Sequence, residues 1–241
     1  MKLLLDIGNT HIHAALATSS RVQRPVHLEV SEIQSLAELA ADQRVTEVAL
    51  CSVAPRTEKR VVKILNQQGH VPVKLTHKNC GVSVDYPKPE SIGPDRLANA
   101  RAGLDEFGGP LVVVDFGTAV TFDIVDASGC YRGGVIAPGL SAMTDYLHEK
   151  TALLPAIQIK TPKRAIGRNT VEAMQIGAVH GYAGLIERVL SGIRAELGVR
   201  QLKAVATGGC ARIMTTHCES IDVVRPRLTL DGLRLASNDW S

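Results

Sequence analysis

Hydrophobic runs near the start of each half of the chain predict two similar β-sheets. Residues 3–8 read Leu-Leu-Leu-Asp-Ile-Gly, and residues 112–117 read Val-Val-Val-Asp-Phe-Gly, so one pattern recurs 109 positions later. Each copy is followed by further strand-like runs, at 11–17 and 26–30 in the first half and at 120–125 and 131–137 in the second. Turn-forming residues separate these runs. We therefore expect one antiparallel meander in each half.

Helical periodicity fills the remainder of both halves. Apolar residues recur at helical spacing in segments 31–41, 57–68, 95–106, 140–148, 170–197 and 228–236. Short strand-like segments lie at 47–53, 203–206 and 221–224. Gly108-Gly109-Pro110 ends the third helical segment just before the second meander. The pattern predicts an α/β fold with two similar lobes, residues 1–108 and 109–241, and an interlobe nucleotide cleft.

Composition excludes several classes of protein. Hydrophobic residues make up 45% of the chain and charged residues 21%, which is globular composition. With only 3% aromatic residues and a net charge of +3, neither base stacking nor a basic surface supports a nucleic-acid partner. The N-terminal apolar run is interrupted at Asp6, which makes it too short for the apolar region of a signal peptide. No segment predicts a membrane span. Five cysteines without a two-residue spacing indicate reduced thiols and a cytoplasmic protein.

The two Asp-x-Gly turns are candidate phosphate sites. Each places a carboxylate at the end of a strand, beside a glycine whose neighbouring backbone N–H groups can closely approach an anion. Asp6 can hold Mg²⁺ directly or through water, and Asn9, Thr10 and Thr118 add neutral donors. One such turn is common by chance. Two copies at equivalent places favour a nucleotide site to which each lobe contributes one hairpin.

Two further motifs add an adenosine loop and a base. Thr207-Gly208-Gly209 follows a predicted strand, and its small residues let adenine or ribose lie against the backbone. In Gly93-Pro94-Asp95-Arg96, Asp95 can accept the proton of a substrate hydroxyl. Arg96, which the helix dipole disfavours in a first turn, can bind an acid or a phosphoryl group. His11-x-His13 supplies only two ligands, too few for a metal site.

In order and spacing, these motifs resemble those of type III pantothenate kinases over nearly the whole chain. The matching segments are Asp6-Ile7-Gly8-Asn9-Thr10, Gly93-Pro94-Asp95-Arg96, Asp115-Phe116-Gly117-Thr118-Ala119, Gly133-Gly134-x-Ile136-x-Pro138-Gly139, Gly167-x-x-Thr170 and Thr207-Gly208-Gly209. The resemblance implies two actin-like (ribonuclease H-like) lobes of the acetate and sugar kinase/Hsc70/actin superfamily. It also implies a homodimer that transfers the γ-phosphate of ATP to pantothenate, the first step of coenzyme A biosynthesis.

The resemblance further implies roles for individual residues. Asp95 becomes the catalytic proton acceptor, and Asp115 holds a monovalent cation, K⁺ or NH₄⁺, beside the Mg²⁺ at Asp6. Pantothenate contacts fall on Tyr86, Gly93, Pro94, Asp95, Arg96 and Thr170. Contacts to ATP fall on Asp6, Ile7, Gly8, Asn9, Thr10, His11, Ile12, His13 and Thr118, with Gly208 and Gly209 as the adenosine loop. Many relatives have Lys where this chain has His13, which leaves the phosphate role of His13 open.

Two alternatives compete with the kinase hypothesis. Another phosphotransferase or phosphohydrolase on the same fold would use ATP without depending on pantothenate. An accessory protein that retains the fold would bind a partner and show little turnover. Because Asp6, Asp95, Asp115 and Thr118 are all present, the sequence disfavours a decayed site.

Overall fold

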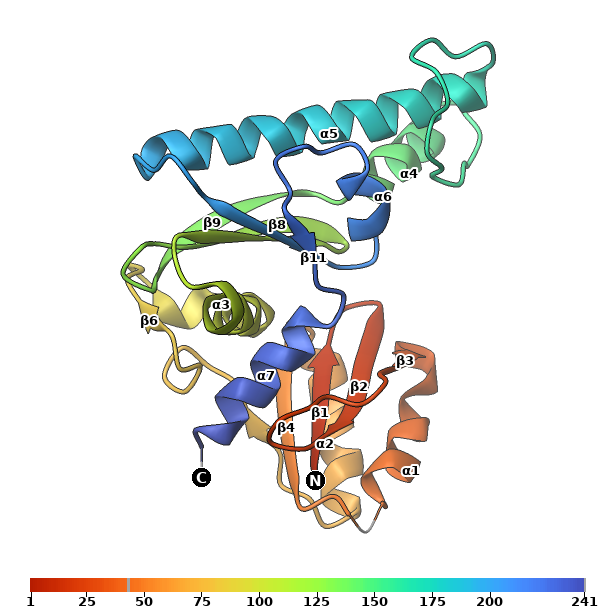
Figure 1. Ribbon diagram of the computed structural model, residues 1–241. Coiled ribbons are helices and arrows are strands. Elements are labelled where there is room, and N and C mark those ends of the chain that lie inside the picture. Colours follow the sequence, from red (N-terminus) through yellow and green to blue (C-terminus); the bar gives the residue numbers. More distant parts are fainter. Residues whose placement is uncertain (43, 241) are drawn as a thin grey trace. The chain divides into compact units, whose positions relative to one another are not determined.

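The computed structural model describes residues 1–42 and 44–240, which form two compact units (Figure 1). Unit 1 comprises Met1–Glu106 together with the segment that begins at Arg227, and unit 2 comprises Phe107–Pro226. The division at 106/107 lies close to the boundary predicted at 108/109. The segment from Arg227 packs in unit 1, whereas the sequence analysis assigned it to the second lobe.

The sheet of unit 1 combines the expected meander with two parallel strands. Strands β1 (Lys2–Ile7), β2 (His11–Ala17) and β3 (Val26–Glu29) are antiparallel neighbours, while β4 (Glu47–Ser52) pairs in parallel with β1. The short strand β5 (Val73–Lys74) pairs in parallel with β4, which gives the order β3-β2-β1-β4-β5. Because side chains alternate along a strand, Leu3, Leu5 and Ile7 enter one core and Asp6 faces the other side.

Helices cover the apolar side of this sheet. Residues of the 3-10 helix η1 (Val30–Ser35), α1 (Leu36–Ala40) and α2 (Pro55–Gln67) pack with Leu3, Leu5 and Ile7 in one core cluster. The helix predicted over 31–41 is thus divided into a 3-10 turn and a short α-helix. Reciprocal hydrogen bonds between Glu29 and Glu32 begin the 3-10 turn.

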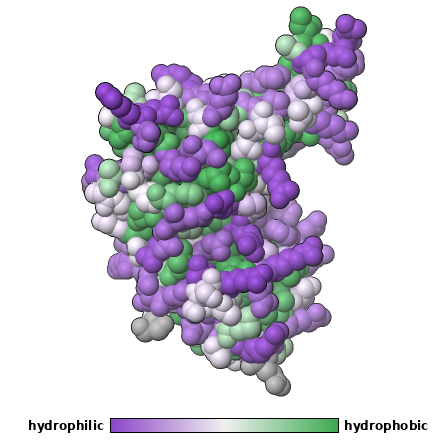
Figure 2. Space-filling view, viewed as in Figure 1, coloured by the Kyte–Doolittle hydropathy of each residue, from purple (hydrophilic) through white to green (hydrophobic). Residues whose placement is uncertain are grey.

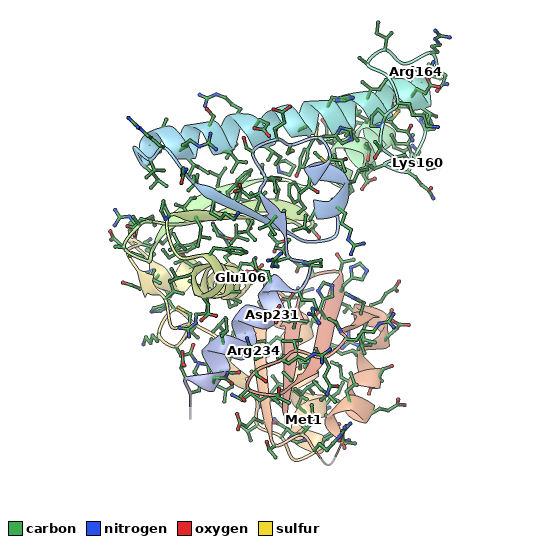
Figure 3. All side chains as sticks on the ribbon, in the orientation of Figure 1. Met1, Glu106, Lys160, Arg164, Asp231 and Arg234 are labelled. Carbon is green, nitrogen blue, oxygen red and sulfur yellow. The ribbon has the colours of Figure 1, made fainter. Side chains whose placement is uncertain are left out.

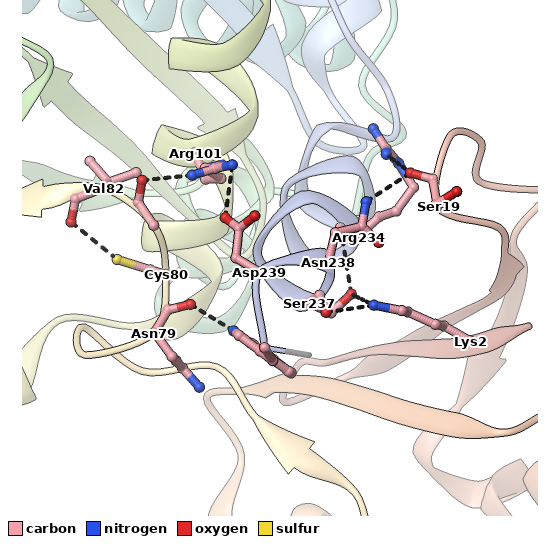
Figure 4. A network of polar contacts seen from close by, with 12 residues as sticks. Lys2, Ser19, Asn79, Cys80, Val82, Arg101, Arg234, Ser237, Asn238 and Asp239 are labelled. Atoms are coloured by element: carbon pink, nitrogen blue, oxygen red, sulfur yellow. Dashed lines mark hydrogen bonds and ion pairs between the residues drawn. The ribbon is translucent and has the colours of Figure 1, made fainter.

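The last helix, α7 (Leu228–Asn238), contacts strands β1, β2 and β4 of the same sheet. Figure 4 shows polar contacts at this helix: Arg234 and Asn238 both donate to the carbonyl of Ser19, and Arg101 pairs with Asp239 at 3.0 Å. Arg101 belongs to α3 (Pro94–Phe107), which follows the short elements β6 (Ser83–Val84) and η2 (Pro89–Ser91). These contacts explain why the C-terminal segment belongs to unit 1.

Unit 2 repeats the strand plan of unit 1. Strands β7 (Leu111–Phe116), β8 (Ala119–Val125) and β9 (Cys130–Pro138) form the meander, and β10 (Lys203–Thr207) pairs in parallel with β7. With β11 (Val223–Val224) beside β10, the order within this unit is β11-β10-β7-β8-β9. The predicted pair of similar α/β units is confirmed.

Helices α4 (Leu140–Lys150), α5 (Thr170–Glu196) and α6 (Ala211–Thr215) belong to unit 2. Ile186 and Leu190 of α5 share a buried cluster with Val112, Val114 and Phe122 of the sheet. The predicted helices at 140–148 and 170–197 agree with α4 and α5 to within two residues. Among the described residues, no helix has the length and apolar character needed to cross a bilayer.

Gly232 lets α7 lie directly against α3. A Cβ atom at this position would fall 1.8 Å from the carbonyl oxygen of Ala98. We therefore expect Gly232→Ala to lower the free energy of unfolding by about 1–3 kcal/mol, measured by urea denaturation. The matched control is Gly192→Ala in α5, where the methyl group meets only the end of the Arg188 side chain, at 3.4 Å. That control should gain up to about 1 kcal/mol, and unchanged stability of Gly232→Ala would contradict the close contact.

Candidate active site

The first Asp-x-Gly segment forms a tight hairpin turn between β1 and β2. The N–H of Gly8 donates to the carbonyl of His11 at 3.0 Å, which closes the turn. A Cβ at Gly8 would lie 3.1 Å from that carbonyl oxygen, so a larger residue would crowd the turn. Asn9 and Thr10 are exposed at its tip. The turn therefore presents polar donors to solvent immediately after the strand that carries Asp6.

Asp6 lies beside an uncharged imidazole. The Nδ1 atom of His13 is 3.6 Å from Oδ2 of Asp6. Burial, together with the nearby His27 and His11, lowers the pKa of His13 to about 4. At neutral pH the ring is therefore uncharged, and the negative charge of Asp6 is not neutralised by it. The carboxylate remains suited to a divalent cation.

Asp95 occupies the first turn of α3, and its surroundings favour a base. Its Oδ1 accepts a hydrogen bond from the N–H of Arg96 at 2.9 Å. A Cβ at Gly93 would lie 2.5 Å from the same oxygen, so the glycine makes room for the carboxylate. Burial raises the pKa of Asp95, and the hydrogen bond and charge of Arg96 offset this only in part. Asp95 is thus a stronger base than an ordinary aspartate.

Cys51 lies near both candidate carboxylates, Asp6 and Asp95. Its Sγ lies 3.5 Å from Oδ1 of Asp6, and both Asp6 and Asp95 act electrostatically on its thiol. Asp6, at the end of β1, and Asp95, at the start of α3, therefore occupy one neighbourhood although 89 positions separate them in the sequence. The sequence analysis did not single out Cys51.

The second Asp-x-Gly segment forms an equivalent hairpin in unit 2. The N–H of Gly117 donates to the carbonyl of Ala119 at 3.1 Å, and Thr118 is exposed at the tip. Gly139 packs against this turn: its N–H donates to the carbonyl of Thr118, and a Cβ there would lie 2.4 Å from that oxygen. The Pro138-Gly139 motif thus supports the hairpin that carries Asp115 and Thr118.

The predicted adenosine loop adjoins the same hairpin. Thr207, the last residue of β10, is the parallel partner of Asp115. Gly208 has φ +89, and a Cβ there would lie 2.5 Å from Oδ1 of Asp115. A residue with a side chain would be strained at this φ and would also displace the carboxylate. Gly209, by contrast, faces open space.

The proposed pantothenate contacts are divided between the units. Gly93, Pro94, Asp95 and Arg96 lie together in unit 1, where Tyr86 is 38% exposed. Thr170 begins α5 in unit 2, after Asn169, whose side chain accepts from the N–H of Glu172. Thr170 also lines a cavity of about 520 Å³ formed by residues of α4, α5 and Leu154. The sequence analysis missed this cavity because its lining comes from segments that are distant in the sequence.

The donor set suits a metal ion that is held mainly by its substrate. Within residues 1–42 and 44–240, no three His, Cys, Asp or Glu side chains are arranged to hold a metal. Mg²⁺ is commonly bound by one or two carboxylates together with water and substrate phosphates. Asp6, beside the β1–β2 hairpin turn at residues 8–11, fits this mode, in which the protein supplies a single carboxylate.

Known proteins share this sequence and arrangement. A model of the type III pantothenate kinase family matches residues 2–192. A type III pantothenate kinase from Akkermansia muciniphila is 45% identical over 98% of this chain and 97% of its own length. Another from Methylacidiphilum infernorum is 42% identical over 97% of this chain and 86% of its own length. The chain belongs to the type III pantothenate kinase family.

Solved structures show the fold that this pantothenate kinase shares with other proteins. A Campylobacter jejuni protein given as a candidate Baf family transcriptional activator has a TM-score of 0.66 at 20% identity, covering 98% of this chain and 97% of its own. A ROK family glucokinase from Streptomyces griseus, solved with glucose and AMPPNP, has a TM-score of 0.53 at 11% identity and covers 97% of both chains. The predicted actin-like α/β fold is confirmed. As a kinase of this family, the protein uses ATP and a divalent metal ion.

The raised pKa of Asp95 predicts that its charge opposes folding at neutral pH. The carboxyl group of Asp95 binds its proton more tightly in the folded state than in the unfolded state. The loss of folding stability that its charge causes is therefore complete above the pKa of the folded state, and it disappears as the pH falls below the pKa of the unfolded state. We expect Asp95→Asn to unfold at a temperature equal to or above that of the wild type at pH 7.5, with the difference shrinking towards pH 4.

Thermal unfolding at several pH values measures this effect. Asp105→Asn is the matched control, because Asp105 is exposed on the same helix and should give little change at either pH. A clear loss of stability in Asp95→Asn at pH 7.5 would contradict the desolvation of Asp95.

Proposed function

We propose that this protein transfers the γ-phosphoryl group of ATP to the hydroxyl of pantothenate and forms 4′-phosphopantothenate, the first step of coenzyme A biosynthesis. The observation that carries this proposal is the nearly full-length match to type III pantothenate kinases. The site supports it independently, because each unit presents an Asp-x-Gly hairpin and unit 1 also supplies a carboxylate with a raised pKa.

Asp95 accepts the proton of the pantothenate hydroxyl as the hydroxyl oxygen attacks the γ-phosphorus of ATP. The bond from that phosphorus to its bridging oxygen breaks, and ADP leaves with the electron pair. The raised pKa of Asp95 favours the proton transfer, because burial makes the carboxylate more basic than an ordinary aspartate. Arg96, the next residue, binds the carboxylate of pantothenate or the transferring phosphoryl group. Gly93 and Pro94 line the same pocket, and Tyr86 and Thr170 provide further substrate contacts.

In each unit, the Asp-x-Gly hairpin binds phosphate groups of ATP. The backbone and side chains of Asp6 to His13 contact the phosphates in unit 1, and Thr118 does so in unit 2. His13 contributes as a neutral hydrogen-bonding group, since its pKa of about 4 leaves it uncharged. Asp6 would hold Mg²⁺, which would supply positive charge to the phosphates of ATP. Gly208 and Gly209 form the surface against which adenosine lies.

Asp115 holds the monovalent cation, K⁺ or NH₄⁺. Its carboxylate lies at the end of β7, where the Thr118 hairpin and the Gly208 loop converge. Backbone carbonyls in these turns are suitable further ligands for a weakly hydrated monovalent ion. Because Gly208 has no side chain, nothing at that position displaces the Asp115 carboxylate that we propose as the ligand of this ion.

The protein is a homodimer that associates through the α4–α5 face of unit 2. This face exposes Met143, Tyr146, Leu147 and Val171 around the apolar cavity. Segment 151–169, which carries Lys160 and Arg164 (Figure 3), also exposes Leu153 (90%) and Ile166 (81%). Figure 2 shows hydrophobic side chains among polar ones around this segment. A second copy would bury this apolar surface together with Thr170.

A cytoplasmic location is consistent with the chemistry of the cysteines. All five are free thiols, and three of them are buried. Proteins of oxidising compartments more often pair their cysteines as disulfides.

Phosphorylation of pantothenate by the purified protein tests the main proposal. We expect 4′-phosphopantothenate, detected by mass, with ATP and Mg²⁺ in potassium buffer, and little product in sodium buffer. Asp95→Asn should lower kcat by about 10²–10⁴-fold, because a positioned base is lost while the shape of the residue is kept. Equal turnover in both buffers would remove the monovalent cation, and near-normal turnover of Asp95→Asn would overturn the role of Asp95.

The same assay separates the alternatives. ATP consumption that does not depend on pantothenate would indicate another phosphotransferase or a phosphohydrolase. A folded protein that neither consumes ATP nor makes product would indicate an accessory function.

The mass of the protein in solution tests the dimer. We expect light scattering to give twice the mass of one chain for the wild type. Ala173→Glu, which places a charge in the apolar cavity, should give a monomer, because an unpaired charge is costly to bury. Ser191→Glu is the control at an exposed position of the same helix and should remain dimeric. A dimeric Ala173→Glu would place the interface elsewhere.

A further inference from the structure

Cys51 is a buried side chain for which the proposed mechanism has no role. It belongs to a row of four polar residues that lie directly opposite one another on adjacent strands of unit 1. Cys51 of β4 is the partner of Asp6 of β1, Asp6 is the partner of His13 of β2, and His13 is the partner of His27 of β3. The row lies on the sheet face opposite the cluster that contains Leu5 and Ile7.

The row holds the Asp6 carboxylate from both sides. The thiol of Cys51 donates to Oδ1 at 3.5 Å, and Nδ1 of His13 lies 3.6 Å from Oδ2. The ring of His27 meets that of His13 edge-on, with centroids 4.6 Å apart, and so supports it from the outer side. Both oxygens of Asp6 thus face a polar side chain on an adjacent strand.

Cys51 is suited to donate a hydrogen bond and unsuited to carry a charge. Its side chain has no exposed surface. A thiol at this fully buried place can donate its S–H to the Asp6 carboxylate, whereas a charged group there would be costly to bury. A neutral donor at this place contacts Asp6 without competing for a metal ion as an ionised thiolate would.

A donor at this place restrains the orientation of the Asp6 carboxylate. The terminal torsion of an aspartate side chain has a broad energy minimum, so the backbone alone does not fix the plane of the two oxygens. A group that must meet a phosphate-bound ion has to be held within about 0.5 Å and 10–20° of its working geometry. In this row, strand pairing fixes the Cα positions, and the polar neighbours fix the carboxylate.

We propose that Cys51 is a positioning residue for phosphoryl transfer, whose S–H hydrogen bond orients the Asp6 carboxylate at the phosphate hairpin. The inference rests on the proposed function, because that function gives Asp6 its place at the triphosphate. It assigns no bond-forming step to the sulfur.

Three substitutions separate hydrogen bonding from packing. Cys51→Ser keeps a donor, Cys51→Val fills the site without one, and Cys51→Ala lacks both donor and volume. We expect Cys51→Val and Cys51→Ala to raise the KM for MgATP about 5- to 10-fold, as the loss of one hydrogen bond to a charged group predicts. Cys51→Ser should stay within about 2-fold of the wild type, and the KM for pantothenate should not change in any of the three.

Cys80→Ala is the matched control for loss of a buried thiol. Cys80 is also fully buried in unit 1, but its thiol contacts carbonyl oxygens rather than a carboxylate. These belong to Val82 (Figure 4) and to His77. Cys80→Ala should lower the unfolding temperature without changing the KM for MgATP. Unfolding temperatures of all four variants show how much each change costs in packing.

Two results would overturn the role of Cys51. One is a KM for MgATP in Cys51→Val equal to that of Cys51→Ser. The other is a change in MgATP KM that follows the loss of thermal stability across all variants, including Cys80→Ala.

Failure of the proposed function gives a different result. In that case the wild type makes no 4′-phosphopantothenate, and the affinities of the same variants for Mg²⁺ and a non-hydrolysable ATP analogue, measured by calorimetry, decide the role of Cys51 instead. A 5- to 10-fold weaker affinity in Cys51→Val with a normal affinity in Cys51→Ser would then support it.

Discussion

In each unit, the strand that carries the aspartate of the Asp-x-Gly motif pairs with a neighbouring strand on both of its sides, and the candidate site depends on this pairing. β1 lies between β2 and β4, and β7 lies between β8 and β10. In both strands the residues on either side of the aspartate, Ile7 and Leu5 or Phe116 and Val114, enter an apolar core. A slip of one residue would exchange the two faces and place Asp6 or Asp115 in that core. The hydrophobic register therefore determines where the carboxylates lie.

Surroundings then give similar carboxylates different chemistry. Asp95 is desolvated, and its pKa rises despite the neighbouring Arg96, which suits a base. Asp6 is flanked by Cys51 and His13, both uncharged at neutral pH, so neither of these two neighbours neutralises its negative charge. Because unit 1 holds both groups, the substrate deprotonation and metal binding that we propose would depend on one sheet and one helix.

Sequence patterns predicted the elements that are locally encoded. The duplicated meander, the two Asp-x-Gly turns and the long helix 170–197 all follow from periodicity and turn chemistry within short windows. The sequence analysis did not predict the short strands β5 and β6, because each contains only one apolar residue and so shows no apolar run. The sequence predicted that α7 is a helix but assigned it to the wrong unit. The helix packs in unit 1 through Gly232 and Arg234, and these residues contact Ala98 and Ser19, which are far away in the sequence.

The sequence by itself determined which side chains are candidates for the chemistry, since carboxylates, glycines and hydroxyls at strand ends and helix starts are visible as motifs. Only the tertiary structure decided which other residues act on them. Cys51 lies 45 positions from Asp6 and has no motif of its own, yet parallel pairing of β4 with β1 places it opposite the carboxylate. Likewise, His27 meets His13 only through the β2–β3 register. Strand pairing joins segments whose separation in the sequence is unconstrained, and this is the physical reason that local pattern cannot reveal such neighbours.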